Sequence, residues 1–121
     1  MSERPWVSRY MVERLRMLGD WRRYARIIAK AACQVIPGAR TYVFGSAASG
    51  NLTSLSDVDV LVELPREVKP LERLELKLSV FEKAVELGLP WDYPVDLHVA
   101  GPAEAAWYKG RSKIVEIWPD G

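Results

Sequence analysis

Three short apolar runs, each followed by glycine or proline, most strongly limit what this chain can fold into. They are residues 40–45 (RTYVFG), 58–64 (VDVLVEL) and 95–99 (VDLHV). Gly45 ends the first run, Pro65 follows the second, and Gly101 comes two residues after the end of the third. Runs of this length that are rich in β-branched and aromatic residues and bounded by such breakers are typical of β-strands. The sequence therefore predicts a small β-sheet.

Two helices are expected before the first strand. Residues 6–18 predict a short helix that Gly19 ends, and Asp20 can cap the helix that follows. The apolar residues of this second helix recur at helical spacing and predict its buried face: Trp21, Tyr24, Ile28, Ala31 or Ala32, and Val35.

A third helix is expected between the second and third strands, with Pro70 at its first position. Its predicted buried face consists of Leu71, Leu74, Leu78, Phe81 and Val85. Residues 103–109 predict a short helix, and residues 113–118 predict a strand or an irregular segment. This order of elements indicates an α+β or α/β fold in which helices cover one face of a small sheet.

A length of 121 residues fits one domain. Its expected parts are a helical N-terminal part (1–38), a sheet core (39–100) and a C-terminal tail (101–121). The single cysteine, Cys33, excludes an intramolecular disulfide, and the sequence shows neither a leader nor an apolar run that could span a bilayer. These features predict a cytoplasmic protein.

Charge is distributed unevenly along the chain. Residues 1–40 contain nine Lys or Arg residues and three acidic residues, whereas residues 41–121 contain eight and thirteen. The basic excess is either a solvated helix surface or a wall that attracts a polyphosphate or an acidic partner.

Two aspartates stand at the beginning of the second strand. Residues two apart on a strand point to the same face, so Asp57 and Asp59 are expected side by side. Neighbouring carboxylates stay ionised most easily around a cation, and Mg²⁺ binds one or two protein carboxylates together with water and phosphate oxygens. The alternative is that Asp57 caps the loop and Asp59 is exposed at a sheet edge.

The residues before and after this pair favour the metal hypothesis. Gly45-Ser46 directly follow a strand, where a turn can present N–H groups and a hydroxyl to a phosphate. Asn51-Leu52 stand where a P-loop requires Lys and Ser or Thr, which excludes that motif. Asp96 lies within the third strand, and three aspartates beside a phosphate-binding turn suit a two-metal site for phosphoryl or nucleotidyl transfer.

Gly45-Ser46, ten further residues and then Asp57-Val58-Asp59 resemble the signature of the polymerase-β-like nucleotidyltransferase superfamily. The short chain is similar to the minimal nucleotidyltransferases, and the similarity covers roughly residues 20–100. The resemblance implies an α+β fold in which a small mixed sheet is backed by helices. It further implies that Asp57 and Asp59 hold two Mg²⁺ ions, that Asp96 binds the metal nearer the acceptor, and that Gly45 and Ser46 hold the phosphates of ATP.

The resemblance also suggests a partner. Minimal nucleotidyltransferases typically act with helical HEPN proteins, as antitoxins that adenylylate the toxin, which predicts a Mg²⁺-dependent protein adenylyltransferase. Two alternatives stay open: a non-catalytic antitoxin that binds its partner stoichiometrically, and a small-molecule nucleotidyltransferase that acts as a dimer. A membrane association is not expected, and a nucleic acid is not the expected substrate.

Several other residues have two interpretations. His98 is interpreted as a structural residue rather than one that touches the acceptor, and Cys33 as an inert core residue. Arg66 and Lys69 are interpreted as exposed loop charges. The hydroxyl residues of the loop are expected to form turns rather than to bind nucleotide: Ser49, Thr53, Ser54 and Ser56. The aromatic residues near the C-terminus can pack on the sheet or form a partner surface: Trp107, Tyr108 and Trp118.

Overall fold

The structure, a computed structural model, describes residues 5–120 and the side chains of residues 9–120. Residues 1–4 of the predicted N-terminal part and Gly121 of the predicted tail lie outside the described residues. The described chain contains five helices and four strands, in the order α1 (Pro5–Gly19), α2 (Trp21–Val35), β1 (Arg40–Phe44), α3 (Gly45–Ser49), β2 (Val58–Glu63), α4 (Pro70–Glu86), β3 (Val95–Ala100), α5 (Pro102–Arg111) and β4 (Val115–Ile117).

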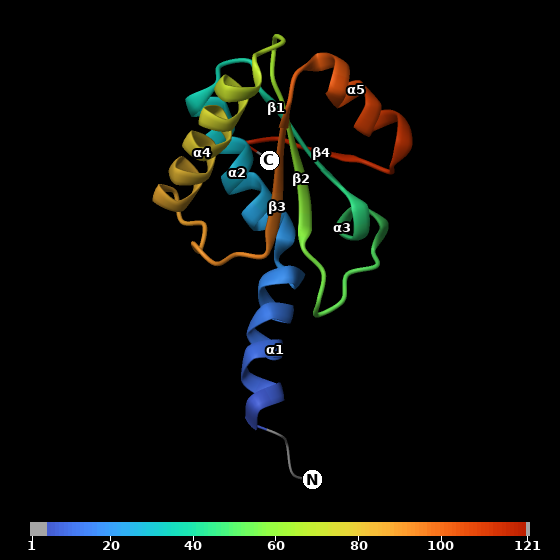
Figure 1. The fold of residues 1–121 in the computed structure, drawn as a ribbon. Coiled ribbons are helices and arrows are strands. Elements are labelled where there is room, and N and C mark those ends of the chain that lie inside the picture. Colours follow the sequence, from blue (N-terminus) through green and yellow to red (C-terminus); the bar gives the residue numbers. More distant parts are fainter. Residues whose placement is uncertain (1–4, 121) are drawn as a thin grey trace.

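The strands form one mixed sheet in the order β3-β2-β1-β4 (Figure 1). β1 pairs antiparallel with β2 and with β4, whereas β2 and β3 are parallel. The prediction of an α+β fold with a small mixed sheet is confirmed. The segment 113–118, for which the sequence left a strand and an irregular segment open, contains β4.

Helices α2 and α4 lie together against one face of the sheet (Figure 1). The predicted face of α2 is largely correct, since Trp21, Ile28, Ala31 and Ala32 are buried. Tyr24 and Val35 pack at the margin of the same core. Three further alanines of this region, Ala25, Ala29 and Ala39, are buried as well. Small residues let the helix approach the sheet and α4 closely.

The expectation that helices cover only one face was wrong, because α5 and the short α3 lie on the opposite face (Figure 1). A second apolar cluster forms there from Tyr42, Leu61, Ala100 and Ala105. Val60, Leu61 and Val62 are consecutive and fully buried, so β2 has apolar side chains on both faces and needs cover on both.

The predicted buried face of α4 was largely wrong, since of its five residues only Phe81 packs against the core. Leu71, Leu74 and Leu78 are 68%, 52% and 56% exposed, whereas Val80 and Ala84 are buried. Helix α4 carries apolar residues around most of its circumference, so periodicity alone does not identify its inner face. The inner face of α4 combines Val80 and Ala84 with Leu76 and Phe81, and a row of leucines is left on the surface.

Helix α1 extends away from the sheet and its covering helices (Figure 1). The predicted cap at Asp20 is not formed by its side chain, which instead lies 3.6 Å (Oδ2) from Arg23 Nη1. The hydroxyl of Tyr93 donates a hydrogen bond of 3.0 Å to the carbonyl of Met17 and so ties α1 to the body. Among the described residues, no helix combines the length and the apolar character needed to cross a bilayer.

Candidate active site

Two of the predicted aspartates lie side by side on the face of the sheet that carries α3 and α5. Asp59 of β2 and Asp96 of β3 are direct partners in the parallel register of these strands. This pairing agrees with the expectation that the third strand lies beside the second. Parallel neighbours point to the same face, so both carboxylates reach one point above the sheet.

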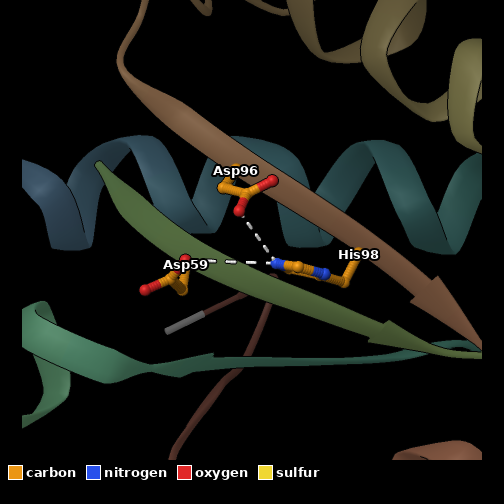
Figure 2. Close-up of side chains that lie close together, drawn as sticks. All are labelled: Asp59, Asp96 and His98. Carbon is orange, nitrogen blue, oxygen red and sulfur yellow. Dashed lines mark ion pairs between the residues drawn. The ribbon is translucent and has the colours of Figure 1, made fainter.

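His98 joins these two carboxylates, as Figure 2 shows. Its Nε2 lies 3.2 Å from Asp96 Oδ2 and 4.0 Å from Asp59 Oδ1. Asp59, Asp96 and His98 each offer one ligand atom, and these atoms all lie within 4.8 Å of one another. His98 lies two residues after Asp96 and therefore shares its strand face. Its interpretation as a structural residue stays a prediction.

Asp57 lies just before β2 and is outside that group. Its Oδ1 accepts a hydrogen bond of 3.0 Å from Nη2 of Arg14 in α1. The same guanidinium donates to the carbonyls of Ser54, at 2.6 Å, and Ser56, at 3.0 Å. Arg14 therefore fixes both Asp57 and the loop in front of it, a role that no local pattern in the sequence indicated.

Gly45 approaches Asp59 so closely that no other residue fits there without a shift. A Cβ atom at this position would clash with Asp59 Oδ2 and lie 3.2 Å from its Cγ. Gly45 has a φ of 69°, in the left-handed region that glycine adopts readily. Gly45 begins α3 and lies directly against the acidic cluster of Asp59, Asp96 and His98, and Ser46 follows it in the helix.

The cluster disfavours the ionised form of Asp59. Burial raises the pKa of this carboxyl most, the charges of Asp96 and Asp57 raise it further, and His98 lowers it. A cation between the carboxylates would reverse the effect of the like charges. Two carboxylates and a neutral imidazole nitrogen form a donor set that fits a divalent metal ion.

The remaining candidate residues lie away from this cluster or support it. Arg66 forms an ion pair of 2.6 Å with Glu72, which agrees with an exposed structural charge. Thr53 and Ser56 hydrogen-bond within their own loop, as expected for turn residues. Cys33 is half-buried, and its thiol lies 3.7 Å from the carbonyl of Ala39.

The aromatic residues near the C-terminus differ in their exposure. Tyr108 packs on the sheet, with its ring 5.2 Å from Phe44 and 5.5 Å from His98. Trp107 and Trp118 are 54% and 61% exposed. The first therefore supports the acidic cluster, and the other two are available to a partner.

Comparison with known proteins finds similarity over most of the chain. Residues 25–117 match the family model of the nucleotidyltransferase domain. A search of curated proteins finds no match. Among solved structures, the chain is similar to a crystal structure of a candidate nucleotidyltransferase from Sulfolobus solfataricus, with a TM-score of 0.56 and 23% identity over 92% of this chain and 88% of that chain. At this identity the similarity shows a shared fold.

Proposed function

Because the family match extends over more than half of the chain, this protein belongs to the nucleotidyltransferase-domain family, and we propose that it transfers AMP from ATP to a hydroxyl of a partner protein. Its fold is that of the polymerase-β-like nucleotidyltransferases. The observation that carries the proposal is the direct pairing of Asp59 with Asp96, together with the close approach of Gly45 to Asp59.

Each predicted site residue has a role in this proposal. Asp57, Asp59 and Asp96 would hold two Mg²⁺ ions, which neutralise the triphosphate and stabilise the attacking and leaving oxygens when bound. Gly45 and Ser46 would bind the β- and γ-phosphates through the backbone and the hydroxyl. Asp96 would accept the proton of the acceptor hydroxyl while the new oxygen–α-phosphorus bond forms and pyrophosphate leaves.

A macromolecular acceptor fits the surface around the cluster. An open pocket of about 330 Å³ is lined by His98 and by Arg73, Leu74 and Lys77 of α4. It adjoins the exposed leucines of that helix. The pocket is open in the described part of the chain, and in this proposal a partner positions the hydroxyl there. Such positioning can lower a barrier by about 7–11 kcal/mol, and free small molecules would lack it.

The partner we propose is a helical HEPN-type protein, and the pair would act as toxin and antitoxin in the cytoplasm. This part rests on the resemblance of the Gly-Ser and Asp-x-Asp motif to minimal nucleotidyltransferases. Exposed apolar residues on two further elements provide surface for such a partner, namely Tyr10 and Leu15 of α1 and Trp107 of α5.

The test is co-expression of the chain with its neighbouring gene products, followed by purification of the complex and addition of ATP and Mg²⁺. We expect the intact mass of the partner to increase by one or more AMP units, and peptide mapping to place them on a hydroxyl. EDTA should abolish both the transfer and the binding of ATP measured by calorimetry, because clustered acids repel a bare triphosphate.

Asp96→Ala is the control for a folded protein without activity. Removing one of several clustered carboxylates should preserve or raise the melting temperature, and the loss of this metal ligand should abolish transfer. A partner that binds tightly and never gains AMP would support the stoichiometric antitoxin instead. Efficient transfer to free sugars or aminoglycosides, without any partner, would support the small-molecule enzyme.

A further inference from the structure

We propose that His98 is a metal ligand, and that it gives the site formed with Asp59 and Asp96 a preference for Mn²⁺ or another first-row transition-metal ion over Mg²⁺. This proposal rests on the proposed function only in one respect, the reaction in which the bound ion would take part. The site itself is inferred from the three side chains in Figure 2.

The position of the imidazole nitrogen is the first argument. Nε2 of His98 is buried and makes no hydrogen bond of acceptable geometry, although Asp96 Oδ2 is 3.2 Å away. Asp59 Oδ1 is 4.0 Å from the same atom. Ligand atoms at adjacent positions of an octahedral ion, with bonds of about 2.1 Å, lie roughly 3 Å apart, and opposite ones lie roughly 4.2 Å apart. The distances of 3.2 and 4.0 Å from Nε2 to the two carboxylates fall near these values, and all three atoms lie within 4.8 Å of one another, so small side-chain movements would let them bind one ion.

The orientation of the ring is the second argument. Nδ1 of His98 lies 3.4 Å from the hydroxyl of Tyr108, and the ring lies among those of Phe44 and Tyr108 at centroid distances of 5.3 and 5.5 Å. A metal-bound histidine commonly donates its other N–H to such a partner, which fixes the ring and the tautomer. In the tautomer that carries its proton on Nδ1, the N–H can donate to Tyr108 and the lone pair of Nε2 points to the two carboxylates, an arrangement that a cation between them would stabilise.

The site is also accessible. The side chain of His98 keeps 27% of its surface exposed, and that of Asp96 keeps 55%. Water molecules and a phosphate oxygen can therefore complete the coordination of an ion held by these three side chains.

Ligand chemistry then determines the preferred ion. Sites of carboxylates and water suit Mg²⁺, whereas an imidazole nitrogen favours transition-metal ions. Among these ions, the affinity for such a site is lower for Mn²⁺ than for Co²⁺. Of the two ions in the proposed reaction, the one beside His98 should therefore be exchangeable for Mn²⁺ with a gain in affinity. The other site, with oxygen ligands, should retain the usual behaviour towards Mg²⁺.

The test uses the full chain without a histidine tag, freed of metal and kept without nucleotide or partner. Because His98 is the only histidine of the sequence, a ¹⁴N imidazole coupling in the pulsed electron paramagnetic resonance spectrum of bound Mn²⁺ identifies this residue directly. We expect that coupling in the wild-type protein and in Tyr108→Phe, which keeps the imidazole. We expect it to vanish in His98→Gln, with at least a tenfold loss of Mn²⁺ affinity and less than a threefold change for Mg²⁺.

Bound Mn²⁺ without nitrogen coupling in the wild-type protein would overturn the proposal, whether or not the variants fold. Equal Mn²⁺ affinity of wild type and a folded His98→Gln protein would also overturn it and leave His98 as a structural ring. Neither measurement depends on AMP transfer. A failed transfer assay with a positive coupling would therefore refute the proposed function alone.

Discussion

The close approach of Gly45 to Asp59 predicts that Gly45→Ala damages the site far more than a backbone penalty alone would. Both Gly45 and Gly50 have positive φ, 69° and 75°, and both flank α3. A side chain at Gly50 meets nothing within 4 Å, whereas one at Gly45 meets the Asp59 carboxylate. Gly50→Ala is thus a matched control for the backbone effect.

The magnitudes follow from this difference. An alanine in the left-handed region costs about 1–2 kcal/mol, so Gly50→Ala should lower the free energy of unfolding by that amount and the melting temperature by about 4–8 °C. Gly45→Ala adds the displacement of Asp59. We expect an additional loss of about 1–2 kcal/mol. We also expect a fall in Mn²⁺-supported AMP transfer of more than about 100-fold, because a displaced ligand no longer holds its ion.

Urea denaturation of the two variants, alone and combined with Asp59→Ala, provides the assay. Removing the Asp59 carboxylate should reduce the cost of Gly45→Ala to that of Gly50→Ala, since the clash with Oδ2 is lost. If Gly45→Ala costs the same in both backgrounds and keeps its metal affinity, the close approach does not exist and the reasoning is refuted.

Three further predictions concern the framework around the site. Tyr93→Phe should cost about 1 kcal/mol through its lost hydrogen bond to α1. Burial raises the pKa of the Tyr93 phenol in the folded protein. The neutral phenol therefore contributes its full stability below the usual pKa of about 10, and that contribution is lost as the pH rises above this value. In urea titrations, Tyr93→Phe should reduce this loss of stability at alkaline pH. Leu78→Gln should change stability by less than about 0.5 kcal/mol, whereas Val80→Ala should cost about 2 kcal/mol; equal effects would place the buried face of α4 elsewhere. Arg14→Gln should increase hydrogen exchange in residues 51–57 without unfolding the sheet, and unchanged exchange would show that Arg14 does not hold this loop.

The strands were predictable because local signals and tertiary packing agree at these positions. Breakers close each apolar run, and the predicted bounds 40–45 and 58–64 differ from β1 and β2 by one residue. The pairing of Asp59 with Asp96 was also within reach, since an acidic residue in an apolar strand points to a site more often than to packing.

The inner face of α4 could not be predicted in this way. The exposed leucines of α4 fit helical periodicity just as well as its buried residues do. Which of the two faces is buried depends on the shape of α2, against which α4 packs. The cover on the second face depends similarly on where α5 docks, which Lys109 helps to fix through its ion pair of 2.6 Å with Glu63. Contacts between segments so far apart in the chain leave no periodic signal.

Asp57 and Asp59 show how two identical residues, two positions apart, acquire different properties from such contacts. Arg14, distant in sequence, gives Asp57 a charged partner, whereas burial and the charge of Asp96 disfavour the ionised form of Asp59. The motif therefore specifies which oxygens are present, and the packing specifies which of them most needs a cation. Asp59 also lies close to Gly45 and beside His98. A bound cation is therefore needed most at the point where Gly45, Asp59 and the imidazole of His98 come together. The metal preference assigned to His98 thus follows from the same local arrangement that makes Asp59 the centre of the site.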